Sequence, residues 1–211
     1  MKLTIFGATG GTGSCLVEQA LAAGHDVTAV VRDPARVAAA GHPRLHVVTA
    51  DIMDPDAITA PLAGADAVLT AAGPRGTGPT TVIQDSVRSI VAAMQKTGDR
   101  RLLMLSGSIV ADEGESPLLR YALKPVARRT FLRHVCADMR AGESEVEASD
   151  LDWTIIRPPR LTSKPATGTY RTAIDRNLRS GLTVTRADLA AYMLSLISDP
   201  ATIGEHVAIA H

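Results

Sequence analysis

A glycine-rich turn near the start of the chain has residue types suited to binding phosphate. Gly7, Gly10 and Gly13 follow the apolar segment Leu3–Phe6 and precede a helical pattern. One glycine permits a tight turn, one lets the backbone approach a diphosphate, and one lets the helix pack against the strand. The helix then directs its free N–H groups and its positive dipole end at the phosphates.

The spacing of this turn is GxxGxxG rather than GxGxxG, so the prediction rests on its position between a strand and a helix. The alternative is a glycine turn with a purely structural role. The cofactor contacts that we expect from the turn are Gly7, Thr9, Gly10, Gly11, Thr12 and Gly13.

The end of the second apolar segment, Val27–Val31, indicates which dinucleotide binds. About 20 residues after the glycines, an acidic residue typically holds the ribose of NAD, whereas an arginine accommodates the 2′-phosphate of NADP. Arg32 lies at this position, and Arg36 is placed to close on the same phosphate. NADPH is therefore favoured over NADH. The alternative is that both arginines are solvated and that Asp33 binds the ribose.

The elements that must position these residues alternate between strands and helices. Most of the apolar runs are continuous, as in strands that are covered on both faces. The expected strands are Leu3–Phe6, Val27–Val31, Leu45–Val48, Ala67–Ala71, Leu102–Leu105, Thr154–Ile156 and Val207–Ala210. This alternation predicts an α/β fold with one domain over residues 1–211, a Rossmann-like doubly wound parallel sheet with helices on both faces.

Two later segments have clear helical signals. An apolar stripe of period 3.6 runs from Ile83 to Met94, and Gly98 follows as a stop. The segment Ala187–Ile197 follows Thr185 and carries Asp188, which together resemble a capping box. The least regular region, 106–152, is expected to be a longer crossover that partly covers the active face.

Side chains that follow the later strands are candidates for the second ligand, because ligands of such sheets bind beyond the carboxyl ends of the strands. Ser106 and Ser108 are the candidate catalytic residues, through hydrogen bonds to the nicotinamide carboxamide or the acceptor; alternatively they only end the strand. Arg160 and Tyr121 are candidate substrate contacts, although Arg160 is equally well interpreted as a surface arginine. Further cofactor contacts are expected from Ala72, Gly73, Arg75, Ser106 and Pro158.

A basic run lies inside the long crossover. Its members are Arg120, Lys124, Arg128, Arg129 and Arg133. Their near i, i+4 spacing predicts that they line one helix face. Such a face is usually solvated, and the alternative is an electropositive rim that attracts acidic substrates.

The composition is that of an ordinary globular protein, 45% hydrophobic and 21% charged, with 22 basic and 22 acidic residues. A formal charge of zero argues against nucleic acid as the main partner, and no apolar run approaches the roughly 20 residues of a membrane helix. The histidines have no metal-ligand spacing with one another, so we predict no metal. Cys15 and Cys136 are expected to be packed thiols. We expect a cytoplasmic monomer or homodimer.

Several of these segments together resemble a known family. They are GATGGTG, VRDPARV, Pro79–Met94, Leu105–Ser108, Asp152–Pro158 and Thr185–Asp188. They are similar to the atypical short-chain dehydrogenase/reductases with an NAD(P)H-binding domain, and among these to the flavin and biliverdin reductases. The resemblance implies an NADPH-dependent reductase that passes hydride to a flavin, quinone or similar conjugated small-molecule acceptor. It assigns Arg32 and Arg36 to the 2′-phosphate, and Asp51 and Ile52 to the adenine side.

The chain departs from this pattern where a proton donor is expected. Short-chain dehydrogenases normally use a tyrosine whose pKa is lowered by a lysine four residues later, and none of the three tyrosines has that partner. Gly107 stands where the flavin and biliverdin reductases have a serine, and Arg160 where they have a histidine. Hydride transfer to an acceptor that needs no positioned acid is therefore favoured. The alternative function is a non-catalytic, NADP(H)-sensing regulator of the NmrA-like kind; a sugar-nucleotide epimerase or dehydratase is disfavoured.

Overall fold

Parallel strands form the centre of the molecule in the computed structural model, which describes residues 1–74, 76–114, 119–130 and 132–211. The main sheet has eight strands in the order β3-β2-β1-β4-β5-β6-β10-β8, and the last of them runs antiparallel to its neighbour β10. The strands of this sheet are β1 (Lys2–Phe6), β2 (Asp26–Val31), β3 (Leu45–Thr49), β4 (Ala67–Thr70), β5 (Arg101–Leu105), β6 (Asp152–Ile156), β8 (Arg171–Ile174) and β10 (Glu205–Ala210). All seven expected strands are present, to within one or two residues at their ends.

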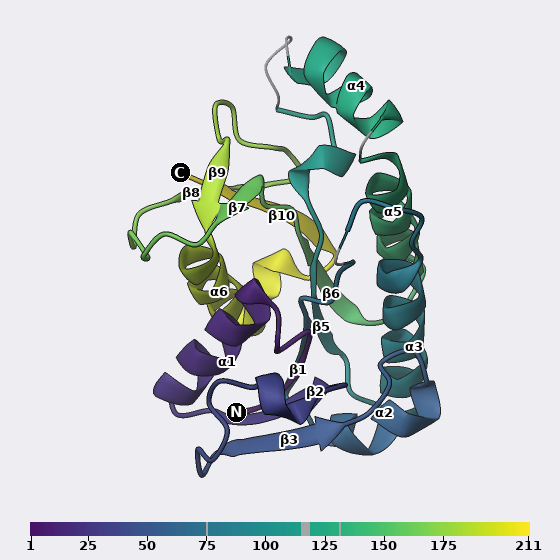
Figure 1. The fold of residues 1–211 in the computed structure, drawn as a ribbon, viewed down its shortest axis with the longest axis vertical. Helices are drawn as coiled ribbons and strands as arrows, with labels where there is room; N and C mark the ends of the chain where they lie inside the picture. The colour runs from purple at the N-terminus through teal and green to yellow at the C-terminus, as the bar shows by residue number, and fades with distance from the viewer. Residues whose placement is uncertain (75, 115–118, 131) are drawn as a thin grey trace.

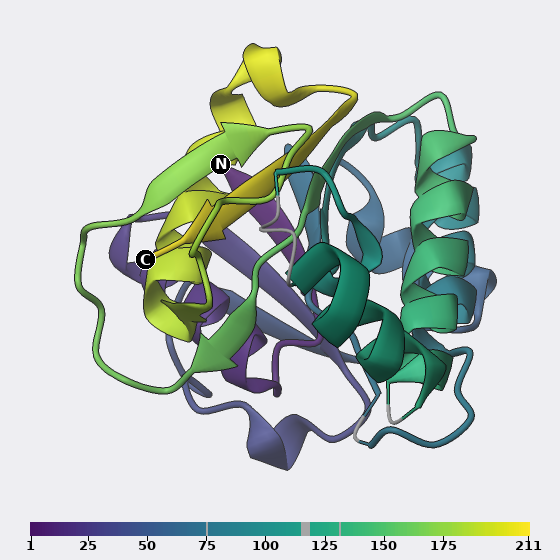
Figure 2. The same ribbon diagram turned by 90° about the horizontal axis from the view of Figure 1, so that it is seen from above.

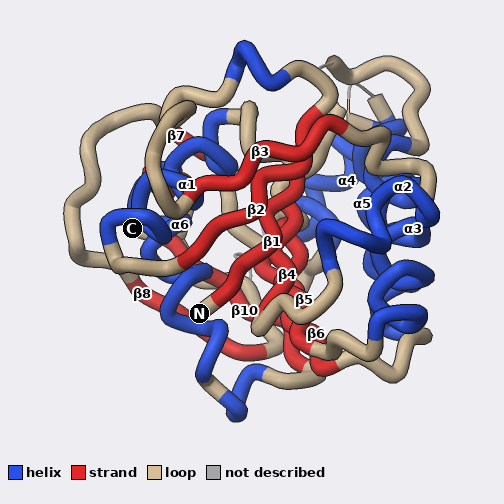
Figure 3. The backbone as a smooth tube through the Cα atoms, turned by 90° about the horizontal axis from the view of Figure 1, so that it is seen from below, coloured by secondary structure: helices blue, strands red, loops and turns tan. Residues whose placement is uncertain are grey.

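Helices cover both faces of this sheet, as predicted (Figures 1 and 3). One face is packed by α1 (Gly11–Ala22) and α6 (Arg186–Ser195), which share a core with β1 and β2. The other face is packed by α2 (Pro55–Leu62), α3 (Val82–Thr97) and α5 (Arg133–Glu147). This arrangement confirms the doubly wound, Rossmann-like single domain.

Local sequence signals begin and end these helices. Thr185 accepts a hydrogen bond from the backbone N–H of Asp188 at 3.0 Å, which confirms the predicted cap of α6. Gly98 ends α3 with a φ of 82°, and its N–H donates to the carbonyl of Met94. These caps fix where α6 starts and where α3 ends.

A second sheet of two short parallel strands was not predicted. It pairs β7 (Arg160–Thr162) with β9 (Thr183–Thr185). Each strand has three residues and is partly polar, so neither gives an apolar run long enough to predict a strand. The antiparallel strand β8 was missed for the same reason.

The long crossover contains η2 (Ser108–Val110), η3 (Leu119–Leu123), α4 (Lys124–Arg129) and α5. Figures 1 and 2 show α4 over the end of the sheet beside α5. The prediction that the basic run lines one helix face is wrong, because α4 ends at Arg129 and a separate helix begins at Arg133. The side chain of Arg120 lies outside the described part of the chain.

Two members of the basic run point inward rather than toward solvent. The Lys124 ammonium donates to the carbonyls of Ser108 and Ala111 at 2.6 and 2.9 Å. Arg128 donates to the carbonyl of Ile109 and forms an ion pair with Asp112 at 2.9 Å. These bonds attach α4 to η2. They also supply donors to backbone carbonyls that have no partner within a helix or a sheet. The two residues are therefore part of a buried support and not of a solvated face.

Candidate dinucleotide and substrate site

A groove of about 750 Å³ lies at the carboxyl ends of the central strands. It is lined by the turns that follow β1, β3 and β4 and by the ends of β2 and β5. In the sheet order, β1 lies between β2 and β4, so the chain reverses its winding direction at this point. Open α/β sheets bind their ligands at such a switch point.

The glycine-rich turn forms one end of this groove. Gly7 has a φ of 74°, and a Cβ there would lie 2.6 Å from the backbone of Ala71. A Cβ on Gly13 would lie 2.1 Å from the carbonyl oxygen of Gly7, so α1 packs against the turn more closely than a side chain allows. These two contacts explain why the turn is built from glycine.

The start of α1 is left open to an anion. Its N-cap, Gly10, has no side chain to accept from the first N–H groups, and the first turn holds no acidic residue. Uncapped N–H groups and the positive end of the helix dipole favour a phosphate at this position. The residues Gly10, Gly11 and Thr12 also line the groove.

Two exposed arginines stand at the other end of the groove. Arg32 and Arg36 both line it, and neither side chain has a hydrogen bond or ion pair with any residue in the described ranges. Asp33 is outside the lining, and its carboxylate accepts from the backbone N–H of Ala35 at 3.2 Å. Asp33 thus caps the turn Pro34–Arg36. This geometry leaves the arginine side chains available for a phosphate, whereas Asp33 does not line the groove.

Most of the predicted cofactor contacts come together in this groove. Those that line it are Gly7, Thr9, Gly10, Gly11, Thr12, Arg32, Arg36, Asp51, Ile52, Ala72, Gly73 and Ser106. Gly13 lies behind the turn, and Pro158 lines the neighbouring cavity instead. Arg75 lies outside the described residues.

An apolar cavity of about 460 Å³ adjoins the groove. The two share the residues Ser106, Leu132, Val135, Met139 and Leu161. Most of the remaining lining residues are apolar, and they come from η2, α4, α5 and the loops around β7 and β9. Leu132, Val135 and Met139 were not predicted, because their position at the site depends on how the long crossover folds back.

Ser106 lies where the groove and the cavity meet. Its side chain is 6% exposed, and its hydroxyl has no hydrogen-bond partner within the described part of the molecule. A buried hydroxyl without a partner costs about 1–3 kcal/mol, so such a group in a binding site is expected to meet a ligand. Ser108 lines the cavity too, with its carbonyl held by Lys124.

The two candidate substrate contacts, Arg160 and Tyr121, lie in different surroundings in the structure. Arg160 is exposed and lines the apolar cavity. Tyr121 is 73% exposed and lines neither the cavity nor the groove, so its assignment to the substrate site stays a prediction. Tyr170 and Tyr192 pack against each other, with ring centroids 5.7 Å apart, and line neither space. Within the described ranges, no tyrosine hydroxyl is placed to protonate a ligand.

The cysteines are packed, as expected. Cys136 is buried in the wall of the apolar cavity, and burial raises the pKa of its thiol. Burial also raises the pKa of the thiol of Cys15, a residue of α1 that packs against the core. A thiol with a raised pKa is a poor nucleophile at neutral pH, so neither residue has the properties of a reactive cysteine.

Arg186 also lines the groove, although the sequence did not indicate it as a site residue. It is the first residue of α6, and a Cβ on Gly11 would lie 2.7 Å from its Nε atom. Its Nη1 donates to the hydroxyl of Ser163 at 2.9 Å. Thr185 and Asp188 mark this position as a helix start, but the sequence does not reveal that α6 begins over the phosphate-binding turn.

Asp188 holds the start of α6 in place. It is buried and accepts hydrogen bonds from the Thr185 hydroxyl, the backbone N–H groups of Thr167 and Gly168, and the ring of His211. Burial alone would raise the pKa of this carboxyl, but the hydrogen bonds outweigh it and hold the pKa well below its ordinary value. A loop and the last strand are thereby tied to α6.

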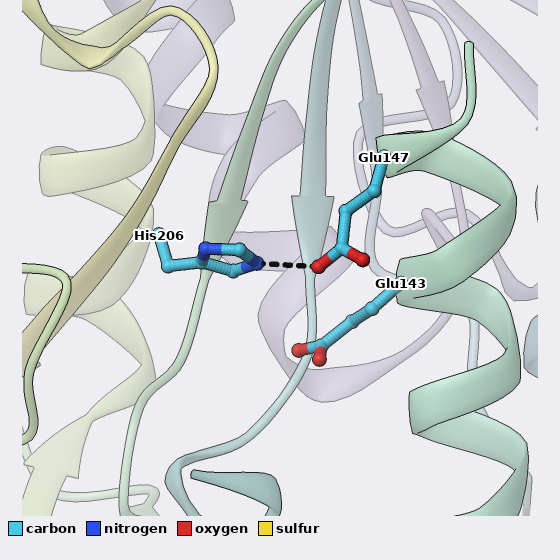
Figure 4. A group of neighbouring side chains, drawn as sticks. All are labelled: Glu143, Glu147 and His206. Atoms are coloured by element: carbon cyan, nitrogen blue, oxygen red, sulfur yellow. Dashed lines mark hydrogen bonds and ion pairs between the residues drawn. The ribbon is translucent and has the colours of Figure 1, made fainter. Parts of the chain in front are cut away.

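Glu143, Glu147 and His206 gather between α5 and β10 (Figure 4). The spacing of ligand types along the sequence did not indicate this group. Both oxygens of Glu143 accept from Arg157, at 2.9 and 2.8 Å, and Glu147 pairs with the His206 ring at 2.8 Å. None of the three lines the groove or the cavity. Their contacts link α5 to β6 and β10, which is a structural role.

Three features of the groove fit a dinucleotide: the switch point of the parallel sheet, the uncapped glycine-rich start of α1, and two arginines with unpaired side chains. Together they define the class of Rossmann-like dinucleotide-binding proteins. The chain belongs to the NAD(P)H-binding family, which it matches over residues 7–200. The resemblance to the atypical short-chain dehydrogenase/reductases is confirmed. None of the described helices is long and apolar enough to span a membrane.

Two relatives illustrate the breadth of the family. An uncharacterised chloroplast protein of Arabidopsis thaliana is 31% identical over 79% of this chain, which spans 61% of the plant protein. A Bacillus subtilis protein named as the uncharacterised sugar epimerase YhfK is 30% identical over 96% of this chain and 90% of its own length. Both matches support the family, and neither relative has a characterised activity by its name.

Solved structures have the same fold. A short-chain dehydrogenase/reductase from Veillonella parvula, in complex with NADP, has a TM-score of 0.85 at 18% identity and covers 100% of this chain and 94% of its own. ChuY, an anaerobillin reductase from Escherichia coli O157:H7, has a TM-score of 0.79 at 24% identity, with 100% and 97% coverage. At these identities the likeness shows the Rossmann-like fold.

Proposed function

We propose that this protein is an NADPH-dependent oxidoreductase that transfers hydride to a flavin, quinone or similar conjugated small molecule. The observation that carries the proposal is the junction at Ser106, where the dinucleotide groove opens into an apolar cavity. A cofactor held by the turn and the arginines supplies a hydride, and a planar acceptor in the cavity takes up the hydride and a proton. Aliphatic walls suit such an acceptor because conjugated rings bury mostly apolar surface.

The residues around this junction position the reactants. Lys124 holds the η2 carbonyls and so fixes the wall that carries Ser108. Leu161 and Met139 form parts of both walls, which brings the two ligands together. With no tyrosine at hand, the acceptor proton comes from solvent, which a conjugated acceptor tolerates because its charge is delocalised. Positioning of this kind lowers the barrier without an acid.

The preference for NADPH is supported by Arg32 and Arg36. Both guanidinium groups are free of protein partners in the described ranges, and arginine forks bind phosphate oxygens with charge-assisted hydrogen bonds. The NADP in the Veillonella structure is consistent with this choice.

A spectrophotometric assay at 340 nm tests the proposal. Purified protein is mixed with NADPH or NADH and with FMN, riboflavin, a quinone or biliverdin in turn. We expect acceptor-dependent oxidation that is faster with NADPH. An NADP(H)-sensing regulator is the second candidate, favoured by the missing proton donor. Tight nucleotide binding in calorimetry without oxidation by any acceptor would replace the first function by the second.

A further inference from the structure

Arg186 places a positive charge directly over the start of α1. Its Cδ and Nε atoms lie within 2.8 Å of the position that a Cβ on Gly11 would take. Gly11 is the first residue of α1, so the half-buried side chain lies across the helix end whose N–H groups have no cap. Both Arg186 and Gly11 line the dinucleotide groove.

This arrangement puts two positive groups together. The N-terminus of a helix carries roughly half a positive charge, and a guanidinium beside it is electrostatically unfavourable. Within the described ranges Arg186 has no carboxylate partner, and the Ser163 hydroxyl is neutral. An anion between the guanidinium and the helix end would satisfy both groups at once.

We propose that Arg186 binds the cofactor diphosphate beside the glycine-rich turn, as a clamp over the start of α1. The hydrogen bond to Ser163 and the fixed start of α6 hold the guanidinium in place, so little side-chain freedom is lost when the anion binds. The inference extends the proposed function, because it requires a dinucleotide in the groove.

The clamp differs in its consequences from the pair Arg32 and Arg36. Those residues stand at the end of β2 and in the turn after it, where the 2′-phosphate that distinguishes NADPH from NADH is expected. The diphosphate is common to both nucleotides and to ADP-ribose. Loss of Arg186 therefore weakens all three ligands by a similar factor, whereas loss of Arg32 weakens NADPH alone.

Isothermal titration calorimetry on the full chain tests the inference. We expect Arg186→Ala to bind NADPH, NADH and ADP-ribose about tenfold more weakly or worse, the usual effect of losing a charged hydrogen bond. Arg186→Lys keeps the charge and should recover part of the affinity. Arg176→Ala removes an exposed arginine that lines neither cavity, and should bind as the wild type does.

The salt dependence separates a clamp from a structural role. The affinity of the wild type should fall more steeply with NaCl concentration than that of Arg186→Ala. The reason is that salt screens the contact between Arg186 and the diphosphate, which only the wild type makes. Ser163→Ala retains the charge and should lose less affinity than Arg186→Ala. Unchanged binding by Arg186→Ala, equal salt slopes or a loss confined to NADPH would overturn the inference alone. A wild type that binds no nucleotide would overturn the proposed function as well.

Discussion

Replacing Ser106 by alanine is expected to stabilise the ligand-free protein and to weaken ligand binding. The buried hydroxyl has no partner in the described part of the chain, and burying it unpaired costs about 1–3 kcal/mol. Removing the oxygen relieves that cost but leaves a small void worth about 1 kcal/mol. The net gain is about 1 kcal/mol, which raises the melting temperature of a chain of this size by about 2–4 °C.

The same change removes a hydrogen bond to the bound ligand. A neutral hydrogen bond contributes about 0.5–1.5 kcal/mol, so the affinity for NADPH or the KM for the acceptor should worsen about two- to tenfold. Which of the two changes tells which ligand the hydroxyl contacts. The measurements are thermal unfolding without ligand, calorimetry with NADPH, and initial rates at varied acceptor concentration.

Ser89 provides a matched control for this prediction. Its hydroxyl is also buried and without a partner in the described residues, but it lies within α3 and lines neither cavity. Ser89→Ala should stabilise the protein at least as much, because alanine is also the better helix former, and should leave ligand binding unchanged. The reasoning is refuted if Ser106→Ala lowers the melting temperature, or if it leaves both the NADPH affinity and the acceptor KM at their wild-type values.

Three further predictions follow from the geometry of the groove and of α6. Arg32→Ala, and more so the double change with Arg36→Ala, should weaken NADPH and leave NADH nearly unchanged in calorimetry; equal losses would contradict the assignment to the 2′-phosphate. Gly13→Ala should push α1 away from the turn, because its Cβ would meet the Gly7 carbonyl at 2.1 Å, and should abolish binding of both nucleotides; wild-type affinity would show that the turn tolerates the methyl group. Asp188 has a lowered pKa in the folded protein, so it stabilises the fold above its unfolded pKa of about 3.9, and this contribution is lost as the pH falls through the folded value. Urea unfolding should therefore find Asp188→Asn less stable than the wild type at pH 7, with a difference that shrinks as the pH is lowered below 4; a difference independent of pH would contradict this linkage.

The sheet could be predicted because most of the central strands are nearly continuous apolar runs. Strands such as β1 and β4 are covered on both faces, so most of their residues are apolar and the strands stand out in the sequence. Strands β7 and β9 give no such signal, since they pair only with each other at the edge of the site. The inward direction of Lys124 and Arg128 could not be predicted either, because charged residues at helical spacing usually face solvent.

The cofactor end and the acceptor end of the site differ in how far their residues are separated along the chain. The phosphate-binding turn, Arg32 and Arg36 lie within the first βαβ unit, where neighbouring segments pack together by local rules. The apolar cavity, where we propose that the acceptor binds, is lined by residues after β5, by the crossover helices and by the loops near Gly181. Its shape depends on how the segment from 106 to 152 folds back and on the small β7–β9 sheet. The sequence therefore predicts the dinucleotide end of the site far better than the apolar cavity. Arg186 was found only in the structure for the same reason, because it begins α6 and is far along the chain from Gly11, which it contacts.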